Sequence, residues 1–197
     1  MTLAELIRTP LKLMDIEQNS DLWLDLRRTK RTASETPIIM GLSPWSTPAR
    51  LAMEKFSADP PPQETNAAME HGHKFENEAR CTYEEEYDIL MPPKVIIRGC
   101  YMASLDGWNQ KKEIVLEIKS PYTHVYSETW QRAVDGKLPD HYYAQVQHQL
   151  MVSGSKLCHF YVYNSRKRRG LMVKVKPNTA YFAVIIKAWE LFYAKYA

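Results

Sequence analysis

The stretch SLDGWNQKKEIVLEIKS, residues 104–120, decides the fold. A polar turn, GWNQKK, separates two short segments with strand-like alternation and therefore predicts a hairpin. Apolar residues take every second position after the turn: Ile114, Leu116 and Ile118. Because side chains alternate between the faces of a strand, Glu117 and Lys119 project together from the opposite face. The hairpin then brings Asp106 back beside Glu117.

These polar residues have two interpretations. On a half-exposed strand, Glu117 and Lys119 simply line the solvated face. Alternatively, two carboxylates and an ammonium group converge at a strand end, where they can hold a divalent metal ion and activate a water molecule. The pattern uses common residue types, so the stretch alone does not choose between the two.

The composition is that of an ordinary globular protein. The 197 residues are 45% hydrophobic and 11% aromatic, enough for a substantial core, and predict a single domain over residues 1–197. The three cysteines have spacings that match neither a disulfide framework nor a zinc site, which favours a reducing compartment: Cys81, Cys100 and Cys158. Without a signal peptide or an apolar run of membrane-spanning length, we expect a cytoplasmic protein with no membrane partner.

The charge is mildly basic but unevenly distributed. A formal net charge of +3 does not by itself indicate a nucleic-acid partner. Basic residues cluster in RRTKR, residues 27–31, and in RKRR, residues 166–169. The second cluster lies between two strand patterns and is either a solvated hairpin tip or a phosphate contact.

The periodicity predicts helices first, then strands, then a helix crossing to another strand pair. This order indicates an α/β (α+β) fold with a mixed sheet flanked by helices. Expected helices cover about 21–30, 35–41, 47–56, 64–87, 123–135, 140–153 and a segment from 178, and expected strands cover 94–98, 101–106, 113–119, 156–164 and 171–176. Serines at helix starts are candidate N-caps: Ser20, Ser34 and Ser46.

Three further groups bear on the site. Glu76 follows Gly72 by one helical turn, and this interior glycine suggests close backbone packing that could turn Glu76 toward the sheet rather than toward water. In YYAQVQHQLMV, Gln145 and Gln149 share one helical stripe, either facing a site or exposed. In RRTKRTASE, a basic run precedes a helix start, where free amides suit a phosphate or form a plain N-cap.

The segments RRTKRTASE, MEHGHKFENEA, SLDG, LEIKSP and YYAQVQHQLMV occur in an order and spacing that resemble the phage lambda exonuclease family of YqaJ-like viral recombinases. That family belongs to the restriction-endonuclease-like superfamily of PD-(D/E)XK nucleases. The resemblance implies a Mg²⁺-dependent 5′-to-3′ exonuclease on double-stranded DNA, with Mn²⁺ as a substitute. It also implies 3′ overhangs for a single-strand annealing protein, a homotrimeric ring around DNA and, for a phage protein, the host cytoplasm.

The resemblance also assigns the catalytic residues by position. Asp106, Glu117 and the Ile118 carbonyl correspond to the metal ligands, and Lys119 corresponds to the residue that orients or activates water. Glu76 matches a helix glutamate that helps to bind a second metal ion. Within the AQVQ segment, the nucleophile is ordered by Gln147 or Gln145, with a slight preference for Gln147.

The same comparison implies a pocket for the terminal 5′ phosphate. Arg27 and Ser34 match an arginine and a serine that hold it, and Ser104 matches a third phosphate ligand. Arg28 is the first alternative to Arg27, and Lys30 and Arg31 are further ones.

Two other classes use the same residues. A structure-specific or nonspecific endonuclease or resolvase of the same superfamily would share the carboxylates, and an inactive DNA-binding module would lack one of the ligands or the lysine, all of which are present. Zinc is disfavoured, because His71 and His73 are two residues apart and do not share a helix face.

Overall fold

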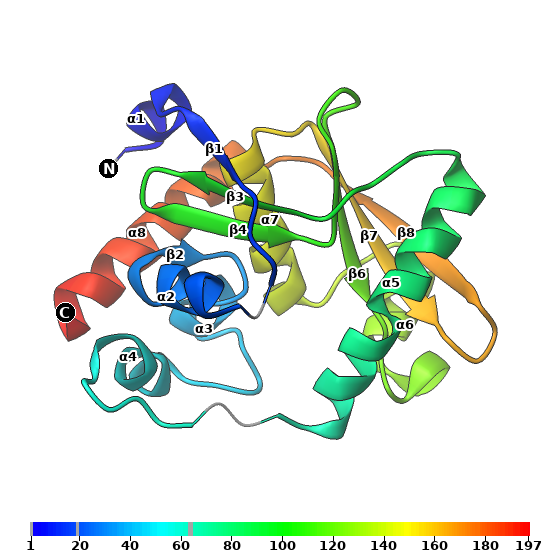
Figure 1. Cartoon of the computed structure of the whole chain (residues 1–197), viewed down its shortest axis with the longest axis horizontal. Helices are drawn as coiled ribbons and strands as arrows, with labels where there is room; N and C mark the ends of the chain where they lie inside the picture. The colour runs from blue at the N-terminus through cyan, green and yellow to red at the C-terminus, as the bar shows by residue number, and fades with distance from the viewer. Residues whose placement is uncertain (1, 19, 63–64) are drawn as a thin grey trace.

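The computed structural model describes residues 2–18, 20–62 and 65–197 (Figure 1). The helices are α1 Leu3–Arg8, α2 Asp21–Thr29, α3 Thr36–Ile39, α4 Pro48–Phe56, α5 Ala67–Tyr87, the short 3₁₀ helix η1 His124–Tyr126, α6 Glu128–Val134, α7 Asp140–Ser153 and α8 Thr179–Tyr196. The strands are β1 Leu11–Met14, β2 Arg31–Thr32, β3 Lys94–Arg98, β4 Tyr101–Leu105, β5 Gly107–Asn109, β6 Ile114–Lys119, β7 Leu157–Asn164 and β8 Arg169–Val175.

Two mixed four-stranded sheets carry the fold, with strand orders β1-β3-β4-β2 and β5-β6-β7-β8. In the first sheet, β3 runs antiparallel to β1 and β4, and the short β2 is parallel to β4. In the second, β6 and β7 are parallel neighbours, and β5 and β8 are antiparallel edges. The predicted mixed α/β fold is confirmed. The expected single sheet is instead divided at Asp106, where the chain leaves β4 and enters β5.

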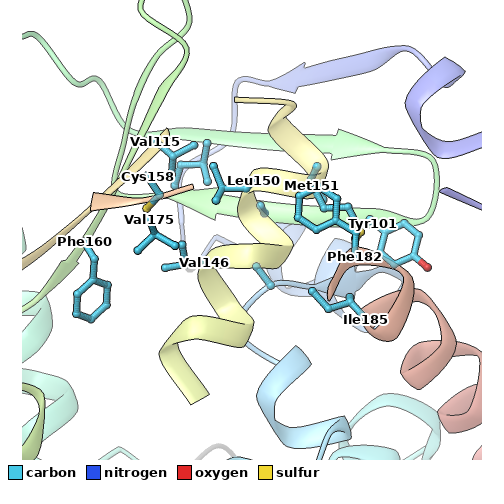
Figure 2. Packing of buried hydrophobic residues seen from close by; sticks show 14 of the residues in the cluster. Tyr101, Val115, Val146, Leu150, Met151, Cys158, Phe160, Val175, Phe182 and Ile185 are labelled. Atoms are coloured by element: carbon cyan, nitrogen blue, oxygen red, sulfur yellow. The ribbon is translucent and has the colours of Figure 1, made fainter. Parts of the chain in front are cut away.

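Helix α7 packs against both sheets and against α8 (Figure 1). Figure 2 shows its apolar side chains among residues of the second sheet, of β4 and of α8: Val146, Leu150, Met151, Val115, Cys158, Phe160, Val175, Tyr101, Phe182 and Ile185. This burial fixes α7 against β4 and β6 and so fixes where its glutamines point. One apolar cluster draws on both sheets, as the predicted single domain over residues 1–197 requires. The domain count itself stays a prediction.

The predicted N-caps are right in one case of three. Ser20 caps α2, and its hydroxyl accepts a backbone hydrogen bond in the first turn. Ser34 and Ser46 are not caps, because the residues after them, Glu35 and Thr47, take those positions in α3 and α4. The Thr47 hydroxyl accepts the first-turn hydrogen bond of α4 and so replaces Ser46, whereas the Glu35 side chain makes no capping hydrogen bond in α3.

The long predicted helix begins later than expected. Asn66 caps α5 with two hydrogen bonds from backbone amides, so the helix starts at Ala67, and Glu64 lies outside the described residues. The packing role inferred for Gly72 is wrong, because a Cβ there would meet nothing within 4 Å. Gly72 instead lines an open cleft, where any side chain would take up space.

Candidate active site

Asp106 and Glu117 lie opposite each other, as the hairpin predicted. The β5–β6 register pairs Gly107 with Leu116, so Asp106, just before β5, stands opposite Glu117 of β6. Asp106 Oδ2 accepts a 2.7 Å hydrogen bond from the Ile118 amide. Only a glycine fits at position 107, since a Cβ there would lie 2.7 Å from Met91 Cβ. The short SLDG segment therefore fixes one carboxylate at the edge of β6.

Lys119 projects from the same face of β6 as Glu117. Its Nζ lies 2.5 Å from Glu117 Oε1 and 5.0 Å from the ring centre of Tyr142, a residue for which no role was predicted. Burial alone would lower the pKa of Lys119, but the Glu117 carboxylate, with Tyr142 and Asp106, outweighs burial and raises it. The lysine is therefore held as a cation against the carboxylates.

Two glutamines of α7 fix the Glu117 carboxylate, which is 1% exposed. Gln145 Nε2 donates to Oε1 at 2.7 Å, and Gln149 Nε2 donates to Oε2 at 2.5 Å. Each oxygen thus has its own amide donor, which leaves little rotational freedom. Gln149 was placed on the right helical stripe but was not assigned to the site.

Gln147 points away from Glu117. Its Nε2 donates to the Lys176 carbonyl at 2.9 Å, and its Oε1 accepts from the Asn178 amide at 2.8 Å, so it joins α7 to the start of α8. The geometry corrects the preference for Gln147 over Gln145. The physical reason is helical periodicity, because residues two apart face in different directions.

Glu76 reaches the site from α5. Burial raises the pKa of Glu76, and the Glu117 carboxylate raises it further against the opposing charges of Lys119, His73 and Arg80. Helix α5 packs on β6, so the predicted orientation of Glu76 toward the sheet is realised although its stated cause, close packing at Gly72, is not.

Asp106 feels the same negative charge. Burial raises its pKa well above the usual value, Glu117 and Glu76 add to the shift, and Lys119 and the Ile118 amide oppose it. Within residues 2–18, 20–62 and 65–197, no three acidic, histidine or cysteine side chains form a ready-made metal cage. Mg²⁺ does not require one, since it keeps several waters and uses one or two carboxylates. The surplus negative charge and the hard oxygen donors fit such an ion.

These groups open onto a cleft of about 890 Å³. Its lining includes the site residues Glu76, Asp106, Ile118, Lys119 and Gln145. Three aromatic side chains also line it and are strongly exposed: Trp45 at 68%, Tyr122 at 58% and Tyr126 at 86%. Large exposed aromatic side chains in a cleft mark a surface for binding a flat or apolar ligand.

Of the residues predicted to bind phosphate, Ser34 lies at the cleft, and Arg27 and Ser104 are linked through Trp23. Ser34 is exposed and lines the cleft. The Arg27 guanidinium lies 4.5 Å from the ring centre of Trp23, whose Nε1 donates to Ser104 Oγ at 2.9 Å. Arg28 points elsewhere and donates to the Ser57 carbonyl at 3.0 Å. The geometry favours Arg27 over Arg28.

The other two alternatives are also engaged away from this group. Lys30 donates to the Gly99 carbonyl at 3.4 Å, and Arg31 donates to the Tyr101 hydroxyl at 2.9 Å. The second basic cluster, residues 166–169, forms the turn between β7 and β8 and the first residue of β8.

Residues 22–156 match the YqaJ-like viral recombinase domain. The chain belongs to this family. It is similar to the uncharacterized protein YqaJ of Bacillus subtilis (strain 168), with 29% identity over a match of 147 residues that covers 70% of this chain and 44% of that protein. It is also similar to the uncharacterized protein R354 of Acanthamoeba polyphaga mimivirus, with 27% identity over 76% of this chain and 29% of that protein. The chain spans less than half the length of either relative.

The fold of this YqaJ-like domain is also similar to that of solved structures. An alkaline exonuclease (LHK-Exo) from Laribacter hongkongensis superposes with a TM-score of 0.72 and 26% identity, covering 89% of this chain and 92% of that one. A phage related exonuclease from Haemophilus somnus 129PT superposes with a TM-score of 0.63 over 87% of this chain and 96% of that one. At 12% identity, the second match shows a shared fold alone. No helix of the described residues is long and apolar enough to span a bilayer.

Proposed function

We propose that this YqaJ-like domain is a DNA exonuclease that digests one strand of a duplex from its 5′ end, with Mg²⁺ as cofactor and Mn²⁺ as a substitute. The observation that carries the proposal is the fixing of Glu117 by Gln145, Gln149 and Lys119 directly opposite Asp106. Such preorganised charge suits phosphodiester hydrolysis, in which negative charge builds on the phosphoryl group. The similarity to an alkaline exonuclease supports the same reaction class.

The site residues would have different roles in the reaction. Asp106, Glu117 and the Ile118 carbonyl would hold Mg²⁺, and Glu76 would contribute to a second ion. When bound, Mg²⁺ would lower the pKa of water and offset charge on the phosphate. Lys119 orients the attacking water and neutralises developing negative charge, and Gln145 aligns the Glu117 carboxylate.

A phosphate pocket beside the cleft would set the direction of digestion. Arg27, Ser34 and Ser104 would hold a terminal 5′ phosphate, so only a strand end can place its next linkage at the carboxylates. Arginine suits this role because its planar fork binds phosphate oxygens in pairs. Digestion from the 5′ end leaves a 3′ overhang, which a single-strand annealing protein would take up.

A closed homotrimer around the duplex would keep the enzyme on its substrate, and cyclic symmetry is the ordinary way for identical chains to form a ring. Light scattering tests this proposal. A particle of three chains supports the ring, and a 23.0 kDa monomer at working concentration contradicts it.

One digestion assay separates the candidate activities. Linear duplexes with 5′-phosphate or 5′-hydroxyl ends are compared with a circular duplex in Mg²⁺. The proposal expects fast digestion of the phosphorylated ends, slower digestion of the hydroxyl ends and none of the circle. Cleavage of the circle would indicate an endonuclease or resolvase, and binding without any cleavage would indicate an inactive DNA-binding module.

A further inference from the structure

Lys55 is a buried cation that holds the end of α2. It lies on α4 and is 6% exposed. Its Nζ donates to the Arg27 carbonyl at 2.6 Å and to the Lys30 carbonyl at 2.8 Å. Cationic side chains stabilise a helix C-terminus in this way, because the last carbonyls of a helix have no partners within it. Lys55 therefore fixes the backbone that carries Arg27.

Glu35 is the carboxylate shared by the two cations. It is 6% exposed and directly follows Ser34, which lines the cleft. Its Oε2 lies 2.8 Å from Lys55 Nζ, whereas its Oε1 lies 3.5 Å from Arg27 Nη2. Lys55 thus forms the closer ion pair with Glu35, and Arg27 forms the longer one.

Because Glu35 is closer to Lys55, the Arg27 guanidinium keeps positive charge that a phosphate can use. Arg27, Lys55 and Glu35 together carry two positive charges and one negative charge. Without Lys55, Glu35 would be buried with a single cation, and the cost of an uncompensated buried charge would draw Arg27 fully toward it. An arginine paired in this way is a poorer partner for an incoming phosphate.

We propose that Lys55 is a positioning residue that engages Glu35 and thereby keeps Arg27 available for the terminal 5′ phosphate. The role rests on the proposed function, because it presupposes that Arg27 meets that phosphate. Glu35 then orients the Arg27 guanidinium through a long contact without neutralising its charge.

A positioning role for Lys55 changes the preference for 5′-phosphate ends, which a merely structural role would not. Lys55→Met should lower the ratio of the digestion rate on 5′-phosphate ends to that on 5′-hydroxyl ends by about tenfold. The double variant Glu35→Gln/Lys55→Met should return the ratio to within about threefold of wild type, because it removes the competitor for Arg27 and leaves no unpaired buried charge. If Lys55→Met does not fold, Lys55→Gln removes the charge and keeps a donor.

Glu54→Gln is the matched control, because Glu54 is the neighbouring acidic residue and pairs with Arg50 on the exposed face of α4. Its rate ratio should equal that of wild type. Equal wild-type rates on the two ends would overturn the phosphate pocket and this role with it. A wild-type preference that loss of the Lys55 charge leaves unchanged, or a double variant as impaired as the single one, would overturn the role of Lys55 alone.

Discussion

Two glutamines on the same turn of α7 should respond to substitution in opposite ways. Gln147 is fully buried and bridges the Lys176 carbonyl and the Asn178 amide. Gln147→Ala removes both hydrogen bonds, each worth about 0.5–1.5 kcal/mol net, because Lys176 and Asn178 are exposed and water can replace the lost partner. For a chain of this size, at about 2–4 °C per kcal/mol, we expect the melting temperature to fall by roughly 2–12 °C.

Gln145→Ala should instead reduce catalysis. It removes one of the two amide donors of Glu117 but leaves Gln149 and Lys119 in contact with that carboxylate. We expect the digestion rate to fall by about tenfold to a hundredfold, as expected for a lost hydrogen bond to a charged group. Thermal unfolding and the initial rate of digestion in Mg²⁺, measured well below both melting temperatures, separate the two effects.

The opposite pattern of effects would contradict these two roles. A folded Gln147→Ala protein with its rate reduced as far as that of Gln145→Ala would place Gln147 at the reacting groups. Unchanged digestion by Gln145→Ala would show that its contact with Glu117 has no part in the reaction.

Three further outcomes are expected. Arg27→Ala should slow digestion of 5′-phosphorylated duplex by one to two orders of magnitude, about the loss of one charge-assisted contact. An unchanged ratio of the rates on 5′-phosphate and 5′-hydroxyl ends would contradict a role for Arg27 in binding the phosphate. Asp106 and Glu76 have raised pKa values in the folded protein, so the folded state holds their protons more tightly than the unfolded state does. The metal-free protein should therefore lose stability as the pH rises from about 4. Melting curves in EDTA test this, and Mg²⁺ should reverse the loss. Trp45 is the one exposed tryptophan of five, all described, so an oligonucleotide bound with Ca²⁺ should quench fluorescence in wild type but not in Trp45→Phe.

Local patterns were enough to place the carboxylates. The apolar residues at every second position of β6 and the polar turn before it put Asp106 opposite Glu117, because strand faces and hairpin pairing depend on neighbouring residues. The three-residue strand β5 was not predicted, since it is too short to show alternation. Its position follows from Gly107, which passes against Met91 where no Cβ fits.

Contacts between distant segments were not predictable. Lys55 meets the carbonyls of α2 from 28 and 25 positions away, and no pattern in the sequence indicates which cation of α4 turns inward. The glutamines show the same limit. Periodicity placed Gln145 and Gln149 on one stripe, but only the packing of α7 decides that this stripe, rather than that of Gln147, faces Glu117.

The most direct test is digestion of a linear, 5′-phosphorylated duplex in Mg²⁺ by Asp106→Ala, with Lys119→Ala measured beside it. Both proteins should fold, as judged by their melting temperatures, because these side chains open onto the cleft. Asp106→Ala should show no detectable hydrolysis and weakened Mg²⁺ binding, and Lys119→Ala should lose hydrolysis while still binding the ion. Digestion by folded Asp106→Ala at a rate near that of wild type would contradict the assignment of this cleft as the active site.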